Sequence, residues 1–184
     1  MARYQVGIRT EARIIDAARQ LLAEQGLEGT TLKAICARAG IQAGSFYNLF
    51  DSKEEVILRV VQESIEAIDP DPAGAGGDTL DDLVAAYITF ITNEAQLARV
   101  YIQVAIGSGS NNHGAAARYL RHHQRRVERF AAAMRRADPG LTAAEAGARA
   151  EVLLGALDGL AFRWVLDGDF DFAAHARRAT DRFS

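Results

Sequence analysis

Residues 39–55, AGIQAGSFYNLFDSKEE, gather hydrogen-bonding side chains around two glycines. These side chains can donate to, or accept from, the base edges and phosphates of nucleic acid, and they are Gln42, Ser45, Tyr47 and Asn48. The small residues Ala43 and Gly44 would let the backbone itself approach base edges. The stretch therefore predicts non-covalent recognition of a DNA major groove.

The surrounding sequence predicts the helices that would position this stretch. Apolar residues recur about every 3.6 positions over residues 10–25, and a glycine closes that run. Thr30 or Thr31 can cap a second helix that stops at Gly40, and a third helix can run over residues 43–49. Two short helices joined by a glycine-containing turn are typical of a helix-turn-helix.

The third predicted helix has one apolar face. Phe46, Leu49 and Phe50 lie at i, i+3 and i+4, so they share a face that can pack on the first helix and on Ile35. The hydrogen-bonding residues then lie on the opposite arc. An alternative is a helical corner whose polar residues simply face water, and the spacing alone leaves both interpretations open.

Composition narrows the class of protein. The 184 residues are 49% hydrophobic and 24% charged, which is typical of a globular chain rather than a disordered one. The net charge of the chain is −3, but it is unevenly distributed. Residues 1–50 carry six basic and four acidic side chains, whereas the remainder carries fifteen basic and twenty acidic ones. This distribution permits an N-terminal part that binds a polyanion. The single cysteine, Cys36, allows no internal disulfide, and we expect it to be a small buried residue.

Helical patterns continue to the end of the sequence, and no segment shows the period-two alternation of a strand. A helix is predicted from Ser52, followed by a linker at residues 69–78 that contains two prolines and three glycines. Three helical stretches follow, with a break at GSGSNNHG after the first, and they cover residues 80–106, 115–138 and 142–166. We therefore expect an all-α protein.

Residues 10–56 resemble the N-terminal DNA-binding domain of the TetR (tetracycline-repressor-like) transcriptional regulators. The resemblance is carried by ARIIDAARQLLAEQGLEGTTLKAICARAGIQAGSFYNLFDSKEEV, and the shared pattern is Gly26, Thr30-Thr31, Ile35, Ala39-Gly40-Ile41, Gly44-Ser45-Phe46-Tyr47, Phe50 and Lys53-Glu54. It implies a three-helix helix-turn-helix DNA-binding domain at residues 1–55. Residues 56–184 would form a helical ligand-binding and dimerisation domain.

The resemblance also implies roles for individual residues. The positions that hold DNA phosphates are matched by Thr31, Tyr47 and Lys53, and those that approach bases by Lys33, Gln42, Ala43, Gly44 and Ser45, while Asn48 could serve either purpose. Gln42 departs from the family pattern because Ser or Thr commonly caps the third helix there. Glutamine is a poor N-cap, so its side chain is left for base contact. We interpret three basic residues as a solvated face, namely Arg9, Arg13 and Arg19.

The C-terminal part is predicted to bind a ligand and a second copy of the chain. Aromatic or polar groups on otherwise apolar helices are the candidate pocket residues, namely Tyr87, Phe90, Tyr101, Gln103, His123, Phe162 and Trp164. Apolar residues at 3- and 4-residue steps form a helix-packing seam that includes Val127, Phe130 and Met134. Small residues four apart, Gly155 and Gly159, would let a neighbouring helix approach closely. Together they predict a four-helix dimer interface. The arginines of residues 118–136 could touch DNA or form a solvated, salt-bridged exterior.

The expected function is a ligand-responsive repressor. Two recognition helices on a two-fold axis would bind a near-palindromic double-stranded DNA operator, and a small-molecule inducer would release it. The alternative is a helical dimer that binds a ligand or a protein and no DNA. The sequence offers no constellation of an enzyme, no metal-ligand cluster and no cofactor motif. With neither a secretory signal nor a run of about 18 apolar residues, we expect a cytoplasmic protein without membrane contact.

Overall fold

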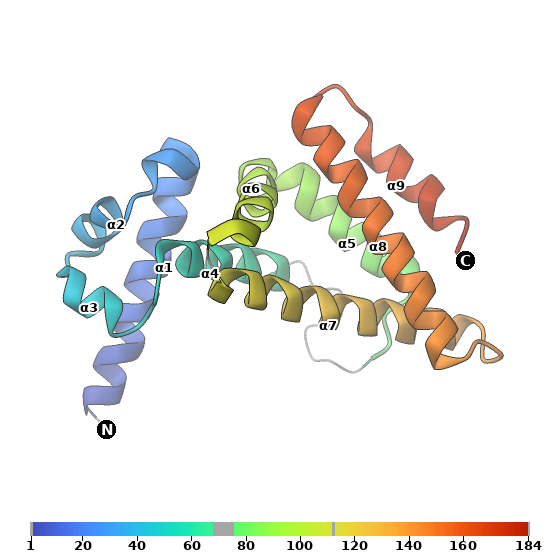
Figure 1. The fold of residues 1–184 in the computed structure, drawn as a ribbon, viewed down its shortest axis with the longest axis horizontal. Coiled ribbons are helices and arrows are strands. Elements are labelled where there is room, and N and C mark those ends of the chain that lie inside the picture. The colour runs from blue at the N-terminus through green and yellow to red at the C-terminus, as the bar shows by residue number, and fades with distance from the viewer. Residues whose placement is uncertain (1, 68–75, 112, 184) are drawn as a thin grey trace. The chain divides into compact units, whose positions relative to one another are not determined.

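The computed structural model describes residues 2–67, 76–111 and 113–183, and within these ranges it contains nine α-helices and no strand (Figure 1). The all-α prediction is confirmed. The chain divides into two compact units, Met1–Ser64 with Gln96–Ala117, and Ile65–Ala95 with Arg118–Ser184. The predicted domains, residues 1–55 and 56–184, are continuous in sequence, whereas each compact unit combines two separate stretches.

The first unit is built on α1. Its helices are α1 (Ala2–Gly29), α2 (Leu32–Ala39), α3 (Ala43–Tyr47), α4 (Lys53–Glu66) and α6 (Ala95–Asn111). The unit includes α4 as far as Ser64 and α6 from Gln96 onward. α2 and α3 lie on one side of α1 (Figure 1). The predicted apolar face of α1 is buried, and Gly26, with φ 67°, interrupts the helix where a stop was predicted.

Polar side chains of α1 tie this unit together. Arg19 donates to Ser64 Oγ at 2.9 Å and to Glu63 Oε2 at 2.8 Å, both near the end of α4. Arg38 of α2 forms two parallel 2.7 Å bonds to the carboxylate of Glu24, which holds the pKa of that carboxyl below its usual range. The interpretation of Arg19 as part of a solvated face is therefore wrong, because it bonds to α4.

The second unit contains the helices that follow the predicted linker. They are α5 (Leu80–Asn93), most of α7 (His113–Ala137), α8 (Ala143–Leu166) and α9 (Phe172–Thr180). One face of α8 is buried at 3- and 4-residue steps from Ala146 to Ala161. α9 packs on α5 and α8, and Phe172 fills the space beside the ring of Tyr87. Asp171 caps α9 by accepting from Ala174 N–H at 3.0 Å.

Several element boundaries differ from those predicted. Residues 80–106 are divided at Glu94, whose φ of −106° and ψ of 42° end α5 before α6 begins. α6 continues through part of the predicted GSGSNNHG break to Asn111, and α7 begins at His113. α9 was not predicted from the sequence. Of the linker at residues 69–78, residues 69–75 lie outside the described part of the chain.

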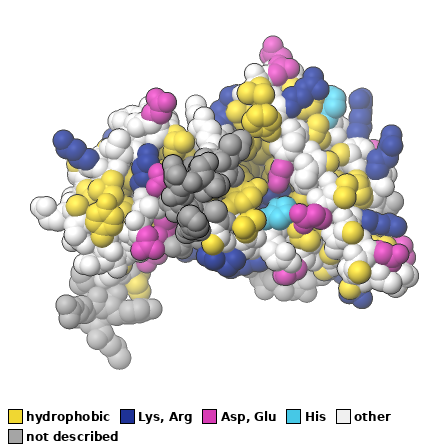
Figure 2. Space-filling model, in the orientation of Figure 1, with side chains coloured by type: hydrophobic (Ala, Val, Ile, Leu, Met, Phe, Trp, Pro, Cys, Tyr) yellow, Lys and Arg dark blue, Asp and Glu magenta, His cyan; other side chains and the backbone are white. Residues whose placement is uncertain are grey.

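Helices with the length and hydropathy of a membrane span are absent from the described ranges. Basic and acidic side chains are interspersed on the face shown in Figure 2.

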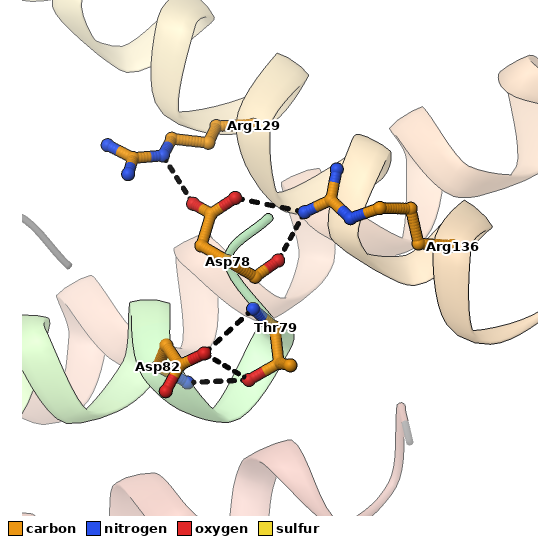
Figure 3. A network of polar contacts seen from close by, with 5 residues as sticks. All are labelled: Asp78, Thr79, Asp82, Arg129 and Arg136. Carbon is orange, nitrogen blue, oxygen red and sulfur yellow. Dashed lines mark hydrogen bonds and ion pairs between the residues drawn. The ribbon is translucent and has the colours of Figure 1, made fainter. Parts of the chain in front are cut away.

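A buried carboxylate at the start of α5 joins this helix to α7 (Figure 3). The Asp78 side chain is 2% exposed and pairs with Arg129 Nε at 2.5 Å and Arg136 Nη2 at 2.9 Å. The same Arg136 nitrogen also donates to the Asp78 carbonyl. Directly after it, Thr79 and Asp82 form a reciprocal capping box that begins α5, and its hydrogen bonds hold the pKa of Asp82 below the usual range. Asp78 therefore fixes where α5 starts against α7.

Replacing Asp78 by alanine should lower the free energy of unfolding by about 2 kcal/mol, because two arginines lose a buried partner but keep part of their solvent contact. Urea denaturation of the whole protein measures this change. The matched control is Asp81→Ala, an exposed acid in the first turn of α5, which should cost less than about 1 kcal/mol. Equal losses for the two variants would contradict the structural role of Asp78.

Candidate nucleic-acid interface

The N-terminus of α2 presents two of the predicted contact residues. Thr31 is the N-cap, and its hydroxyl oxygen accepts from Ala34 N–H at 3.1 Å. Thr31 and Lys33 are exposed, whereas Ile35, Cys36 and Ala39 are buried against the rest of the first unit. Burial raises the pKa of the Cys36 thiol, as expected for a small core residue. The hydroxyl of Thr31 is thus held at the exposed start of the helix by the cap.

The turn into α3 leaves the Gln42 side chain without a capping role. Gln42 is the N-cap by its backbone, with φ −84° and ψ 154°, but its amide makes no cap hydrogen bond. Its carbonyl accepts from Ser45 N–H at 3.0 Å and so starts the helix. Gln42, Ala43, Gly44 and Ser45 are all exposed, and a Cβ added at Gly44 would meet nothing within 4 Å. The first turn of α3 is therefore an open surface of small and polar groups.

Aromatic packing holds α3 in place. Phe46 is fully buried, and its ring lies 5.8 Å from that of Phe50. Tyr47 is 58% exposed, and its ring is nearly perpendicular to that of Phe46, with 5.6 Å between the two ring centroids. Asn48 is exposed and Leu49 is half-buried. The predicted division of the helix into an apolar face and a polar arc is confirmed, although the regular helix ends at Tyr47 instead of Leu49.

Lys53 is the first residue of α4 and lies beside Thr30, just before α2. Its ammonium donates to the Thr30 carbonyl at 3.4 Å, and Thr30 is itself buried with its hydroxyl bonded to the Gly26 carbonyl. The long bond leaves the Lys53 charge half-exposed beside the N-terminus of α2. The nine predicted DNA-contact residues all lie on the first unit and are exposed or, for Lys53, half-exposed, and their contacts with DNA stay predictions.

The predicted pocket residues are divided between the two units. Tyr101 and Gln103 belong to the first unit, and the other five belong to the second. Phe90 is buried, Phe162 is 44% exposed and Trp164 is half-buried. His123 bonds to Glu151 of α8 at 3.0 Å. These residues stay candidates for ligand contact.

Among the candidate pocket residues, Tyr87 contacts both an acidic and a basic side chain. Its hydroxyl donates to Asp158 Oδ1 at 2.8 Å, and the guanidinium of Arg126 lies 4.7 Å above its ring. Arg126 also donates from both terminal nitrogens to the same oxygen at 3.3 Å. Arg126 and Asp158 were not among the site residues predicted from the sequence. The available signal was Asp158 itself, the single acid within the apolar run of residues 152–166.

Burial corrects part of the predicted dimer interface. Val127, Phe130 and Met134 are buried in the single chain, so little of their surface remains for a second copy. The 3- and 4-residue stripe of α7 is thus part of the core of the single chain. Gly155 and Gly159 are exposed on α8, and added Cβ atoms there would meet nothing within 4 Å.

The short helix α3 follows α2 after a turn at Gly40, and α2 packs on α1. This arrangement defines a helix-turn-helix domain in the first unit. Residues 14–60 match the family described as bacterial regulatory proteins, tetR family. The HTH-type transcriptional regulator UidR of Escherichia coli K12 is 30% identical over 127 residues, which span 68% of this chain and 65% of UidR. Residues 14–60 are therefore a DNA-binding domain of the tetR family.

Solved structures support the fold over nearly the whole chain. SmeT, the repressor of the Stenotrophomonas maltophilia multidrug efflux pump SmeDEF, aligns with a TM-score of 0.62 and 23% identity over 94% of this chain and 87% of its own. Thermus thermophilus FadR, a repressor solved with lauroyl-CoA, aligns with a TM-score of 0.71 and 17% identity over 94% of this chain and 92% of its own. At these identities the likeness establishes the fold.

His122 gives the second unit a testable pH dependence. Burial, and then the positive charges of Arg126 and Arg125, lower the pKa of His122 from 6.5 to about 4, although Asp158 opposes the shift. As the pH falls below 6.5, the unfolded chain binds a proton that the folded chain does not take up until about pH 4. Stability is therefore complete above pH 6.5 and decreases as the pH falls from there toward 4.

Between pH 7 and pH 5, the wild-type protein should lose about 2 kcal/mol more unfolding free energy than His122→Gln, which has no proton to bind at this position. Urea denaturation at a series of pH values measures both proteins. Because glutamine also alters the contacts of His122, the comparison uses the pH dependence and not the absolute stability. Parallel profiles would show that His122 does not titrate in the expected way.

Proposed function

We propose that this protein is a transcriptional regulator that binds a near-palindromic operator as a dimer. The observation that carries the proposal is the exposed first turn of α3, in which Gln42 to Ser45 face outward while Phe46 is fully buried. A helix presented by its N-terminal turn fits a major groove, and its small residues allow close approach to base edges. Thr31, Tyr47 and Lys53 flank it as phosphate contacts.

The second unit is proposed to bind a small-molecule inducer. FadR of Thermus thermophilus was solved with lauroyl-CoA, and its fold covers most of this chain. A ligand that binds the second unit better in a DNA-free state would lower operator affinity by that difference. We infer a repressor, since SmeT and FadR are described as repressors. An enzymatic role has no comparable support.

The operator is the first test of the proposal. Purified protein, incubated with a random duplex pool at moderate salt without added ligand, should recover a near-palindromic sequence. Folded, dimeric protein that recovers no sequence would contradict sequence-specific binding and favour a helical ligand- or protein-binding dimer instead.

Two variants assign roles within the recovered site. Gln42→Ala should change which bases are preferred, because its amide is free of a capping role. Lys53→Ala should keep the preferred sequence, lower affinity for all duplexes and flatten the slope of log affinity against log salt by about one. An unchanged base ranking for Gln42→Ala would show that Gln42 reads no base.

The dimer is proposed to form through the exposed face of α8. Val152 is 61% exposed and Leu166 is 72% exposed, and they lie on one stripe with Gly155, Gly159 and Phe162. Apolar side chains and small residues at these steps suit close packing with the same face of a second copy. This arrangement replaces the buried residues of α7 that the sequence suggested.

Val152→Glu should shift the protein from dimer to monomer in sedimentation velocity, because it places a charge within the proposed apolar interface. The side chain is exposed in one chain, so thermal melting should show a folded protein. Ala132→Glu, at an exposed position of α7 away from the stripe, is the matched control and should stay dimeric. A Val152→Glu protein that remains dimeric would exclude this face.

A further inference from the structure

Arg13 connects α1 to the turn between α2 and α3. Its Nη2 donates to the carbonyl oxygen of Ala39 and, at 3.3 Å, to that of Gly40. The contact joins residues 26 and 27 positions apart in sequence. Arg13 is exposed, as expected of a solvated face, and its guanidinium is in addition engaged with the backbone of the turn.

The turn needs donors because a helix end leaves backbone carbonyls without intrahelical partners. The carbonyls of Cys36 and Ala37 accept from Ile41 N–H at 3.0 Å and Gly40 N–H at 3.2 Å. Those of Ala39 and Gly40 accept from Arg13 instead. A cation at the C-terminus of α2 is also favoured by the helix dipole. Arg13 thus completes the cap from outside the helix.

Gly40 is shaped for this contact. Its φ of 63° is the left-handed conformation that glycine adopts without strain, and it ends α2. An added Cβ would also lie 2.9 Å from Arg13 Nη2. A glycine therefore allows both the turn and the approach of the guanidinium. The turn and Arg13 form one unit of local structure.

We propose that Arg13 is a positioning residue for DNA recognition, which fixes the turn and thereby the N-terminal turn of α3. Gln42, the first residue of the exposed α3 surface, follows Gly40 by two positions, so a displaced turn displaces that surface. Arg13 acts through the backbone of Ala39 and Gly40 and not through a contact with DNA. The proposal rests on the proposed function, because its effect on recognition requires an operator.

The bidentate pair of Arg38 and Glu24 supplies a comparison within the same domain. It also ties α2 to α1, through two 2.7 Å bonds, but it touches no backbone atom of the turn. Glu24→Ala therefore removes one link between α1 and α2 and leaves the anchor of the turn intact. Arg9 supplies a second comparison, since it is exposed one helical turn before Arg13 and makes no hydrogen bond or ion pair with the described part of the chain.

The test compares full-length Arg13→Ala, Arg13→Lys, Arg9→Ala and Glu24→Ala with the wild type. On the selected operator, Arg13→Ala should lose on the order of tenfold in affinity, as expected for one charge-assisted hydrogen bond. The affinity ratio between this operator and single-base variants should shrink, while the salt slope stays at the wild-type value. Arg13→Lys, which keeps one donor group, should recover part of the ratio. Arg9→Ala and Glu24→Ala should keep the ratio.

Two results with DNA would overturn the proposal. A uniform loss on all duplexes, with a salt slope flatter by about one, would make Arg13 a phosphate contact. The same loss of ratio in Glu24→Ala, at a matched loss of melting temperature, would make the effect one of general stability. Each result is distinct from a failure of the wild-type protein to select any operator, which overturns the proposed function.

Hydrogen exchange of the free protein tests the positioning step without DNA. Arg13→Ala should speed the exchange of the Gly40 and Ile41 amides and of the α3 amides, and Glu24→Ala should leave α3 unchanged. Unchanged exchange in α3 of Arg13→Ala would overturn the positioning role, whichever duplexes the protein binds.

Discussion

The burial of Phe46 is the interaction on which the proposed DNA-binding surface depends. α3 has only five residues, and a helix of that length has too few internal hydrogen bonds to be stable alone. Its orientation must therefore come from tertiary contacts, chiefly the fully buried ring of Phe46 and the neighbouring ring of Phe50. Because Phe46 occupies the inward position, the helical period places Gly44, Ser45 and Tyr47 on the outer arc. The polarity of the surface follows from one apolar anchor.

Local structure in the first unit could be predicted because local chemistry determines it. The cap at Thr31, the left-handed Gly40 and the spacing of Phe46 and Phe50 act over a few residues. The sequence also indicated that Gln42 would not cap α3 with its side chain, and the structure confirms this. The contact of Arg13 with Ala39 could not be predicted in the same way, because it joins residues that periodicity does not relate.

The second unit was harder to predict because its assignments depend on partners distant in sequence. The stripe of Val127, Phe130 and Met134 has the spacing of a packing face, but spacing does not tell whether the partner is the same chain or another. The nine residues of α9 lack the length that makes a helical period stand out, and their packing on α5 and α8 provides the missing stabilisation. The division at Glu94 leaves no glycine or proline as a marker.

The arginines of α7 show how a strongly basic helix can serve an acidic protein. Arg126, Arg129 and Arg136 lie at steps of three and seven, so they share one side of the helix. They pair with acids from other elements, Asp158 of α8 and the buried Asp78 before α5. An isolated carboxylate as buried as Asp78 would be costly, and these arginines offset that cost. Much of the positive charge of α7 is therefore used in assembling the second unit, and the proposed recognition of DNA relies on the weakly basic first unit, where shape and hydrogen bonding at α3 replace a large positive field.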